Sequence, residues 1–305
     1  MKPPLEESFD VVIVGGGPAG LSAALVLGRC LRRVVVIDAG RPRNRTAHAA
    51  HGFFTRDGAA PDELIRLGRA QLAPYDVVLY EGEAIDVAPS DGGEGWVVKT
   101  KKGRTFRGRK CLLATGMTDR LPEIPGLAEL FGSCVHVCPY CDGWEIKGAK
   151  VGAYACDPGA GEFAMGMLTW SKDVVLFLDG REIAREERER LERNGIVIRD
   201  EKIDAFERQG ERLTAVLLAG GERVARDCVF VHLGQDQTAP FARDLGLPAL
   251  ENGAVVTKKG ERAGPKGLFV AGDASHDLQL IAIAVAEGVK AACAINVELR
   301  RESHR

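Results

Sequence analysis

The sequence lacks any apolar run long enough to cross a membrane: its longest, such as residues 278–286, fall far short of the roughly 20 residues a spanning helix needs. It also lacks a basic block, and its net charge of −2 does not favour nucleic acid or an anionic membrane surface as a partner. The opening residues, MKPPLEES, are too few and too polar for a secretory signal. We therefore expect a soluble, cytoplasmic protein with no nucleic-acid or membrane partner.

Cysteine is too sparse for a disulfide scaffold, with eight in 305 residues. In a reducing compartment, however, a close pair is more often catalytic than structural. Cys138 and Cys141 form a CxxC motif, in which one thiol stabilises its neighbour's thiolate and an exchangeable disulfide can close. The alternatives are two inert buried thiols, or a zinc site that adds Cys134 and His136. Zinc ligands rarely crowd into eight positions, so we favour redox chemistry and expect no metal.

A glycine-rich segment, residues 15–20 (GGGPAG), follows residues 9–14 (FDVVIV), which are typical of a buried strand. Residues 21–30 favour a helix, and residues 33–37 a second strand that ends at Asp38. In this context the glycines let backbone amides approach a pyrophosphate, and the acid can accept hydrogen bonds from a ribose diol. The pattern predicts a dinucleotide-binding unit; the alternative is a glycine turn that binds nothing.

The rest of the chain alternates between strand and helix patterns. In its first half we expect a loop at 41–60, a helix at 61–73, a small meander between Val77 and Phe106, and a buried strand at 110–114. Further on we expect strands at 150–156 and 174–178, helices at 159–171 and 181–194, a three-strand region at 196–232 and a buried helix at 280–296.

The order of the landmarks resembles the low-molecular-weight thioredoxin reductase family: GGGPAG, then ATG at 114–116, then CxxC-Asp-Gly, then LFVAGD at 268–273. The resemblance covers nearly the whole chain. It implies an FAD enzyme of the α/β class with two Rossmann-like, three-layer ββα nucleotide-binding domains, the second inserted into the first. The FAD domain would comprise residues 1–117 and 245–305, and the inserted CxxC domain residues 118–244. Turn-rich segments at 118–126 and 244–253 are consistent with crossing linkers.

The resemblance also implies roles for individual residues. Cys141 would lie next to the flavin, Cys138 would exchange with the substrate, and Asp142 would be the acid/base residue. A helix cap is the alternative role for Asp142, and His136 and His51 are alternative bases. The residues that the resemblance places at FAD are Gly15, Gly17, Pro18, Ala19, Gly20, Asp38, His51, Ala114, Thr115, Gly116, Gly272, Asp273 and Gln279. A homodimer is implied as well.

The inserted domain departs from the family at its expected NADPH loop. Aligned without gaps, the loop glycines become Ala155 and Asp157, with Ala160 at the third small position. An aspartate facing a pyrophosphate repels it and blocks close backbone approach. A shifted register that starts at Gly159 and includes Gly161 fits the glycine pattern, but it needs a longer strand.

A second departure follows the second strand of this domain. The family's His-Arg-Arg cluster is replaced by Leu178-Asp179-Gly180, which leaves a 2′-phosphate without an obvious partner. Arg181 and Arg185 follow, and helix surface is their simpler interpretation. Asp179 is a candidate to hold the ribose diol of NADH instead. The sequence therefore does not favour NADPH as the cofactor.

Three segments, HGFFTRDG (51–58), CPYCDGWE (138–145) and LQLIAIAVAEG (278–288), resemble bacterial thioredoxin-reductase-like flavoproteins. These include dithiol oxidases and reductases fed by ferredoxin or another flavoprotein. We expect an FAD-dependent dithiol/disulfide oxidoreductase that acts on a thioredoxin-like protein or a small-molecule substrate and does not use NADPH efficiently. The alternatives are an NAD(P)H-dependent thioredoxin-disulfide reductase and a non-enzymatic, flavin-bound redox sensor.

Overall fold

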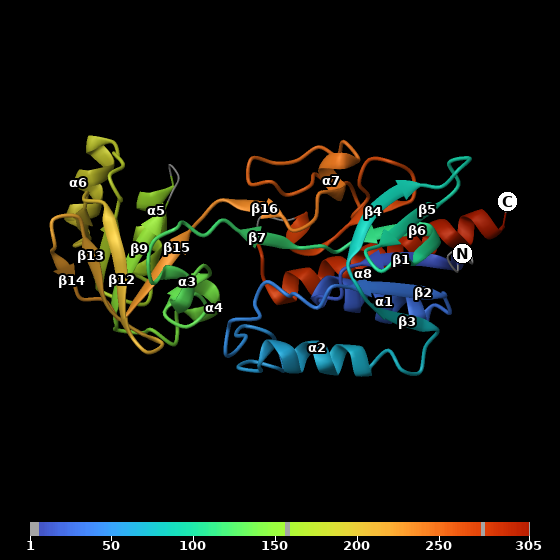
Figure 1. Cartoon of the computed structure of the whole chain (residues 1–305), viewed down its shortest axis with the longest axis horizontal. Coiled ribbons are helices and arrows are strands. Elements are labelled where there is room, and N and C mark those ends of the chain that lie inside the picture. Colours follow the sequence, from blue (N-terminus) through green and yellow to red (C-terminus); the bar gives the residue numbers. More distant parts are fainter. Residues whose placement is uncertain (1–5, 156–158, 276–277, 305) are drawn as a thin grey trace. The chain divides into compact units, whose positions relative to one another are not determined.

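The computed structural model describes residues 6–155, 159–275 and 278–304, which form two compact units (Figure 1). Unit 1 comprises Met1–Arg45, Pro61–Thr118 and Gln235–Arg305, and unit 2 comprises Thr46–Ala60 and Asp119–Gly234. These bounds differ in two places from the expected domains. The chain returns to unit 1 at Gln235 rather than at residue 245, and residues 46–60 belong to unit 2.

Unit 1 is built on a seven-stranded sheet in the order β3-β2-β1-β6-β5-β4, with β17 pairing to β6. Its strands are β1 (Glu6–Val14), β2 (Val34–Asp38), β3 (Val77–Glu81), β4 (Ala84–Pro89), β5 (Trp96–Thr100), β6 (Thr105–Leu113) and β17 (Leu268–Val270). Its helices are α1 (Pro18–Arg29), α2 (Pro61–Ala70), α7 (Phe241–Asp244), the short 3₁₀ helix η1 (Gly272–Ala274) and α8 (Ile281–Ser303). Strands β1, β2, β3, β6 and β17 run parallel, so their carboxyl ends meet at one edge, where such sheets bind ligands.

Both faces of β1 are covered, which explains why its sequence is apolar without alternation. Val11 and Ile13 belong to a core shared with α1 and α8, whereas Val12 and Val14 belong to a second core under the β4–β6 meander. All four side chains are buried, and each such side chain stabilises the fold by about 1.5–3 kcal/mol.

Unit 2 contains a five-stranded parallel sheet in the order β11-β10-β9-β15-β8. Its strands are β8 (Val135–His136), β9 (Lys150–Ala155), β10 (Asp173–Phe177), β11 (Val197–Arg199) and β15 (Cys228–His232). Its helices are α3 (Leu127–Leu130), α4 (Pro139–Asp142), α5 (Ala160–Met167) and α6 (Arg185–Arg193). A separate antiparallel sheet contains β12 (Ile203–Gln209), β13 (Arg212–Leu218) and β14 (Arg223–Val224), and the crossing strands β7 (Met117–Asp119) and β16 (Gln235–Gln237) pair with each other.

Several elements differ from the sequence expectations. β3 is not part of the meander; it pairs in parallel with β2, because α2 carries the chain across in a crossover connection. β15 does not stay with β12–β14 but becomes a central strand of the parallel sheet. The expected return segment, 244–253, turns within unit 1, because Leu245 and Leu247 pack into its core.

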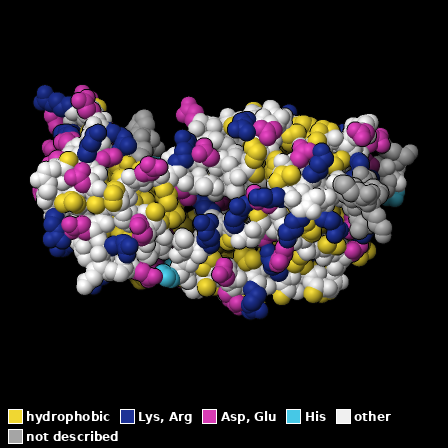
Figure 2. Space-filling model, in the orientation of Figure 1, with side chains coloured by type: hydrophobic (Ala, Val, Ile, Leu, Met, Phe, Trp, Pro, Cys, Tyr) yellow, Lys and Arg dark blue, Asp and Glu magenta, His cyan; other side chains and the backbone are white. Residues whose placement is uncertain are grey.

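The helix boundaries also shift. α5 ends at Met167, before the expected 171, and α6 begins at Arg185, because residues 178–181 form a turn in which Arg181 N–H bonds to the Leu178 carbonyl. The expected helix at 280–296 continues to Ser303 as α8. No helix among the described residues is long and apolar enough to span a bilayer. Acidic and basic side chains are interspersed over the face shown in Figure 2.

A buried lysine ties the end of α8 to β6. Lys110 is 2% exposed, and its Nζ lies 2.6 Å from Glu302 and 3.2 Å from Glu298, both on α8. Burial would raise the pKa of Glu302, but hydrogen bonds and charge from Lys110 and Arg109 outweigh it and lower that pKa. Removing the lysine would leave each carboxylate with one arginine partner, Arg109 for Glu302 and Arg262 for Glu298, and would take away the buried cation that the two share.

Replacing Lys110 with Met is expected to destabilise unit 1 by about 2 kcal/mol, because a partly buried ion-pair network loses its cation. Urea unfolding measures the change. The control is Lys99→Met, which removes a pair with Asp86 in which the lysine side chain is 58% exposed, and which should cost less than about 0.5 kcal/mol. Equal losses in the two variants would show that burial of Lys110 is not what matters.

Candidate functional site

The carboxyl edge of the unit 1 sheet brings together four segments that are distant in sequence. Residues 15–17 join β1 to α1, Asp38 ends β2, residues 114–116 follow β6, and η1 follows β17. Backbone hydrogen bonds hold the first three together: Gly15 N–H donates to the Ile37 carbonyl and Ala114 N–H to the Val14 carbonyl, both at 2.8 Å. The residues expected to bind one cofactor in unit 1 therefore do converge.

The glycines of the loop serve two different purposes. A Cβ at Gly15, where φ is +111°, would lie 2.1 Å from the Ala114 carbonyl oxygen, and one at Gly20 would lie 2.0 Å from the Gly15 carbonyl oxygen. At Gly17 the Cβ position has no atom within 4 Å, and no side chain caps the helix that begins there. The amides of the first turn of α1 thus border a cradle that a side chain would fill and that suits a pyrophosphate.

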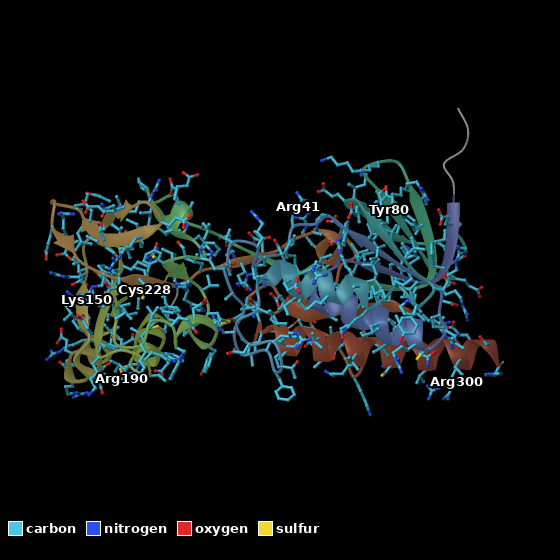
Figure 3. All side chains as sticks on the ribbon, turned by 90° about the horizontal axis from the view of Figure 1, so that it is seen from below. Arg41, Tyr80, Lys150, Arg190, Cys228 and Arg300 are labelled. Carbon is cyan, nitrogen blue, oxygen red and sulfur yellow. A yellow bond between two sulfur atoms is a disulfide. The ribbon has the colours of Figure 1, made fainter. Side chains whose placement is uncertain are left out.

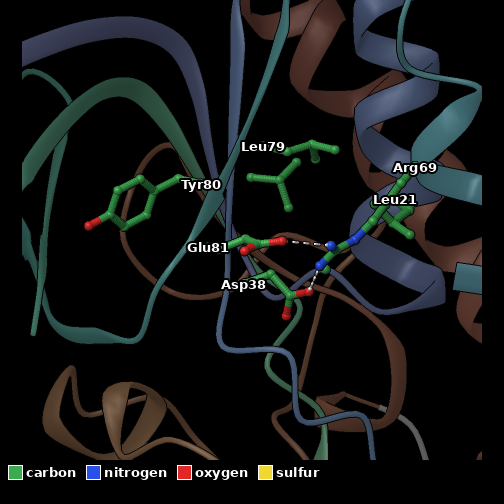
Figure 4. Close-up of a pocket in the computed structure, with 8 residues that line it drawn as sticks. Leu21, Asp38, Arg69, Leu79, Tyr80 and Glu81 are labelled. Atoms are coloured by element: carbon green, nitrogen blue, oxygen red, sulfur yellow. Dashed lines mark hydrogen bonds and ion pairs between the residues drawn. The ribbon is translucent and has the colours of Figure 1, made fainter. Parts of the chain in front are cut away.

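Asp38 lies beside this loop, next to a hollow lined by Gly16, Leu21, Val36, Asp38, Arg69, Leu79, Tyr80 and Glu81 (Figure 4). Its Oδ2 accepts a hydrogen bond from Arg69 Nη2 at 2.5 Å, and its Oδ1 accepts one from Gly40 N–H at 3.1 Å. Arg69 Nη1 also bonds to Glu81 at 3.3 Å. The guanidinium therefore orients the carboxylate that is expected to meet the ribose.

The side chain of Arg43 joins Asp273 to Gln279. Arg43 Nη1 lies 3.3 Å from Asp273 Oδ2 and also donates to Gln279 Oε1. Gln279 exchanges two hydrogen bonds with Gln235, at 2.8 and 3.0 Å. The two residues expected near the flavin are thus parts of one polar network.

Sequence reasoning missed several residues of this site. Glu287 is buried in α8 and accepts a hydrogen bond from Gly272 N–H at 2.7 Å, which fixes η1 beneath Asp273. Its isolation as the one acid in AIAVAEGV could have revealed it. Arg43 and Arg69 had no such signal, because each meets its acidic partners only through the tertiary fold.

In unit 2, Cys138 and Cys141 form a disulfide, with their Cα atoms 5.2 Å apart. Cys138 is the N-cap of α4, and its Sγ accepts a hydrogen bond from Cys141 N–H at 3.1 Å. Pro139 suits the first helical position, so the CPYC sequence itself favours this turn. Among the described residues, no group of three or more His, Cys, Asp or Glu side chains could hold a metal ion.

Two further cysteines are chemically quiet. Burial raises the pKa of Cys111 to about 12, and burial, together with the charge of Asp227, raises that of Cys228 to about 12. Cys228 lies inside unit 2 in Figure 3. Both thiols stay protonated near neutral pH, so neither supplies a thiolate nucleophile.

The sequence profile of the family described as "Pyridine nucleotide-disulphide oxidoreductase" matches residues 9–288. The chain belongs to this family. It is 32% identical to thioredoxin reductase tcpT of Claviceps purpurea, over 92% of this chain and 90% of that protein. Two solved structures are similar: HlmI (33% identity, TM-score 0.92, 98% of this chain and 96% of that one) and an oxidoreductase from Agrobacterium tumefaciens (33% identity, TM-score 0.89, 96% and 99%).

These findings confirm the resemblance to thioredoxin reductases, the fold class of two Rossmann-like domains, and the expectation of a flavin-dependent disulfide oxidoreductase. Membership of the family implies use of a flavin and a pyridine nucleotide. The individual site residues stay predictions.

The pyridine nucleotide site of the family is expected in unit 2, where Asp157 lies outside the described residues. Asp179, in the left-handed region at φ +54°, is engaged within the fold. Its Oδ1 accepts a hydrogen bond from Ile203 N–H at 2.9 Å and its Oδ2 one from the Tyr154 hydroxyl at 3.3 Å. The carboxylate therefore anchors the start of β12, which disfavours the expected role of holding a ribose diol.

The start of α5 is acidic and crowded. A Cβ at Gly161 would lie 2.0 Å from Glu187 Oε1, and Glu162 stands in the first turn of the helix. Carboxylates here oppose a pyrophosphate that would bind the helix N-terminus. Arg190 pairs with Glu162 at 2.9 Å and so offsets one of these carboxylates. The two arginines that follow β10 are engaged elsewhere: Arg181 Nη1 donates to the Leu178 carbonyl at 3.3 Å, and Arg185 is 89% exposed and pairs with Glu189.

His51 falls in unit 2, unlike the other residues expected to bind FAD. Its Nε2 lies 3.5 Å from Glu145 and its Nδ1 lies 3.7 Å from Asp57. The contact with Glu145 joins residues 46–60 to the segment that follows the CxxC motif, whereas the contact with Asp57 lies within 46–60. A flavin contact for His51 stays a prediction.

Replacing Gly17 with Val is expected to abolish flavin binding without unfolding the chain, because the backbone at Gly17 is extended and only the cradle is filled. Flavin absorbance of the purified variant measures the loss. Gly166→Val is the control, since Gly166 also faces open space but lies in unit 2. A fully yellow Gly17→Val protein would contradict the pyrophosphate cradle.

Replacing Arg69 with Met is expected to weaken FAD binding about tenfold, because Asp38 loses the charged hydrogen bond that orients it. Titration of deflavinated protein with FAD gives the dissociation constant. Arg66→Met on the same helix is the matched control, since Arg66 pairs only with Glu63 among the described residues and is 66% exposed. Equal FAD affinities for the two variants would show that Arg69 does not contribute to FAD binding.

Proposed function

We propose that this protein is an FAD-dependent dithiol/disulfide oxidoreductase that works through Cys138 and Cys141 and for which NADPH is a poor electron donor. The observation that carries the proposal is the disulfide at the N-terminus of α4, with Asp142 directly after it. Unit 1 fits FAD: the cradle at Gly17 would take the pyrophosphate, Asp38 the ribose, and Asp273 the ribityl chain. Bound FAD would exchange two electrons with the cysteine pair.

The thiol chemistry follows from the order of the residues. In the oxidising direction, a substrate thiol attacks Cys138 Sγ and gives its proton to the Asp142 carboxylate. The Cys138–Cys141 bond breaks, a mixed disulfide forms with the substrate, and Cys141 leaves as a thiolate. The second substrate thiol then displaces Cys138 and its proton passes to the Cys138 sulfur, so that the substrate disulfide closes, two electrons remain on the cysteine pair, and Asp142 keeps the first proton. The reverse sequence reduces a disulfide.

Two features bear on the substrate. Tyr140, between the two cysteines, and Trp144, three residues after them, are 75% and 71% exposed, so two aromatic side chains close to the pair in sequence are available to a substrate. The relative tcpT is named a thioredoxin reductase, which supports a thioredoxin-like protein as one substrate class; a small-molecule dithiol is the other. Ferredoxin or another flavoprotein are candidate donors, and a homodimer is the proposed assembly.

The proposal that NADPH is a poor electron donor is based on the side chains of unit 2. Asp179 is engaged by Ile203 and Tyr154, and Glu187 lies against the start of α5. The three residues directly after β10, Leu178-Asp179-Gly180, include no arginine for a 2′-phosphate. The names of the relatives favour the second candidate, an NAD(P)H-dependent thioredoxin-disulfide reductase.

Anaerobic stopped-flow absorbance tests both candidates on the holoprotein. Dithiothreitol is expected to bleach the flavin rapidly, and NADPH and NADH only slowly, because electrons enter through the cysteine pair. Cys141→Ser should keep its flavin and lose the dithiol reaction, whereas Cys293→Ser, which removes an exposed thiol in unit 1, should react normally. Fast bleaching by NADPH would instead establish the reductase, and admission of oxygen to the dithiol-reduced protein distinguishes an oxidase from a protein fed by another donor.

A further inference from the structure

His136 stands at the end of β8, two residues before the redox pair. Its side chain is 11% exposed, and its ring packs on Phe230 of the neighbouring β15, with centroids 5.4 Å apart. The imidazole is therefore held between the sheet and the CxxC turn, with little freedom to move.

The charged partner of this imidazole is Asp142. Nδ1 of His136 lies 3.5 Å from Asp142 Oδ1, and this is the one ion pair of His136 among the described residues. The backbone of Asp142 is tied to the same turn, since its N–H donates to the Cys138 carbonyl at 3.1 Å. The carboxylate is 25% exposed and so more open to solvent than the imidazole. The histidine therefore lies on the protein side of the carboxylate, and the carboxylate is the more accessible of the two groups to a substrate.

We propose that His136 is a positioning residue for Asp142, and this inference rests on the proposed function. The imidazole, with Nδ1 3.5 Å from Oδ1, limits how the carboxylate can turn, so that one oxygen faces the substrate thiol while that thiol attacks Cys138. His136 itself takes no proton from the substrate. Its contribution is to keep Asp142 from rotating toward solvent, which would leave the attacking sulfur without a base.

The test compares four variants of the holoprotein with wild type by the rate at which dithiothreitol bleaches the flavin anaerobically. His136→Phe keeps a ring on Phe230 but removes both nitrogens. His136→Asn places an amide N–H close to the position of Nδ1. Asp142→Asn removes the base, and the double variant His136→Phe/Asp142→Asn completes a cycle. His232→Phe is the control, because His232 is an exposed histidine at the end of β15 that stacks on Phe163.

Asp142→Asn is expected to slow the reaction about a hundredfold, the lower range for general acid–base groups, and His136→Phe about tenfold. His136→Asn should recover most of the rate, and in the Asp142→Asn background His136→Phe should have no further effect. Flavin content and melting temperature confirm that each variant is folded. If His136→Phe fails to fold, His136→Asn is compared with His136→Gln, whose amide lies one methylene further out. The inference then expects His136→Asn to be the faster of the two.

Full activity in His136→Phe, or a further loss of rate in the double variant, would overturn the inference, because His136 would then be dispensable or would act without Asp142. Equal rates for His136→Asn and His136→Gln would overturn it as well. The proposed function fails separately: wild type would not be bleached by dithiothreitol at all, or Cys138→Ser would react as fast as wild type.

Discussion

Unit 1 depends on the close approach of two segments, η1 and α8, to the first turn of α1. A Cβ at Gly288 would lie 2.2 Å from the Ala19 carbonyl oxygen, and one at Gly272 would lie 2.9 Å from the Ala19 Cβ. These contacts let α8 and η1 pack directly against the glycine loop, although more than 250 residues separate them in sequence. Such packing leaves no room for even one extra methyl group. It sets where η1 and Asp273 lie relative to the glycine loop.

The sequence allowed prediction of the elements that are determined by residues close together in the chain. β1 and β2 are buried on both faces and carry unbroken apolar runs, and the glycine loop lies between such a strand and a helix. The CPYC turn was also recognisable. What could not be predicted depends on distant partners: β3 joins β2 only after α2 crosses over, and Arg43 and Arg69 meet Asp273 and Asp38 only in the fold. The polar return strand β16 carried no linker signal.

The two units place an aspartate after their second strand, but its surroundings differ. Asp38 accepts hydrogen bonds from the Arg69 guanidinium and from Gly40 N–H, two residues further on, and it borders a hollow. Asp179 accepts hydrogen bonds from the Tyr154 hydroxyl and from Ile203 N–H, which ties it to the start of β12. The aspartate therefore borders a hollow in one unit and braces a strand in the other, so equivalent positions of similar folds have different surroundings here.

Residues 46–60 belong to unit 2 although both flanking segments belong to unit 1, and His51 fastens them to Glu145. On the ribosome this segment emerges long before Glu145 and the sheet around it have been synthesised. It must therefore wait, exposed, while much of unit 1 is still missing its last strand and α8. Unit 2 has all its residues once Gly234 has been synthesised, whereas unit 1 still needs Gln235–Arg305, and a fragment that spans 119–234 alone lacks part of its own structure. The unit that begins second can therefore be completed first.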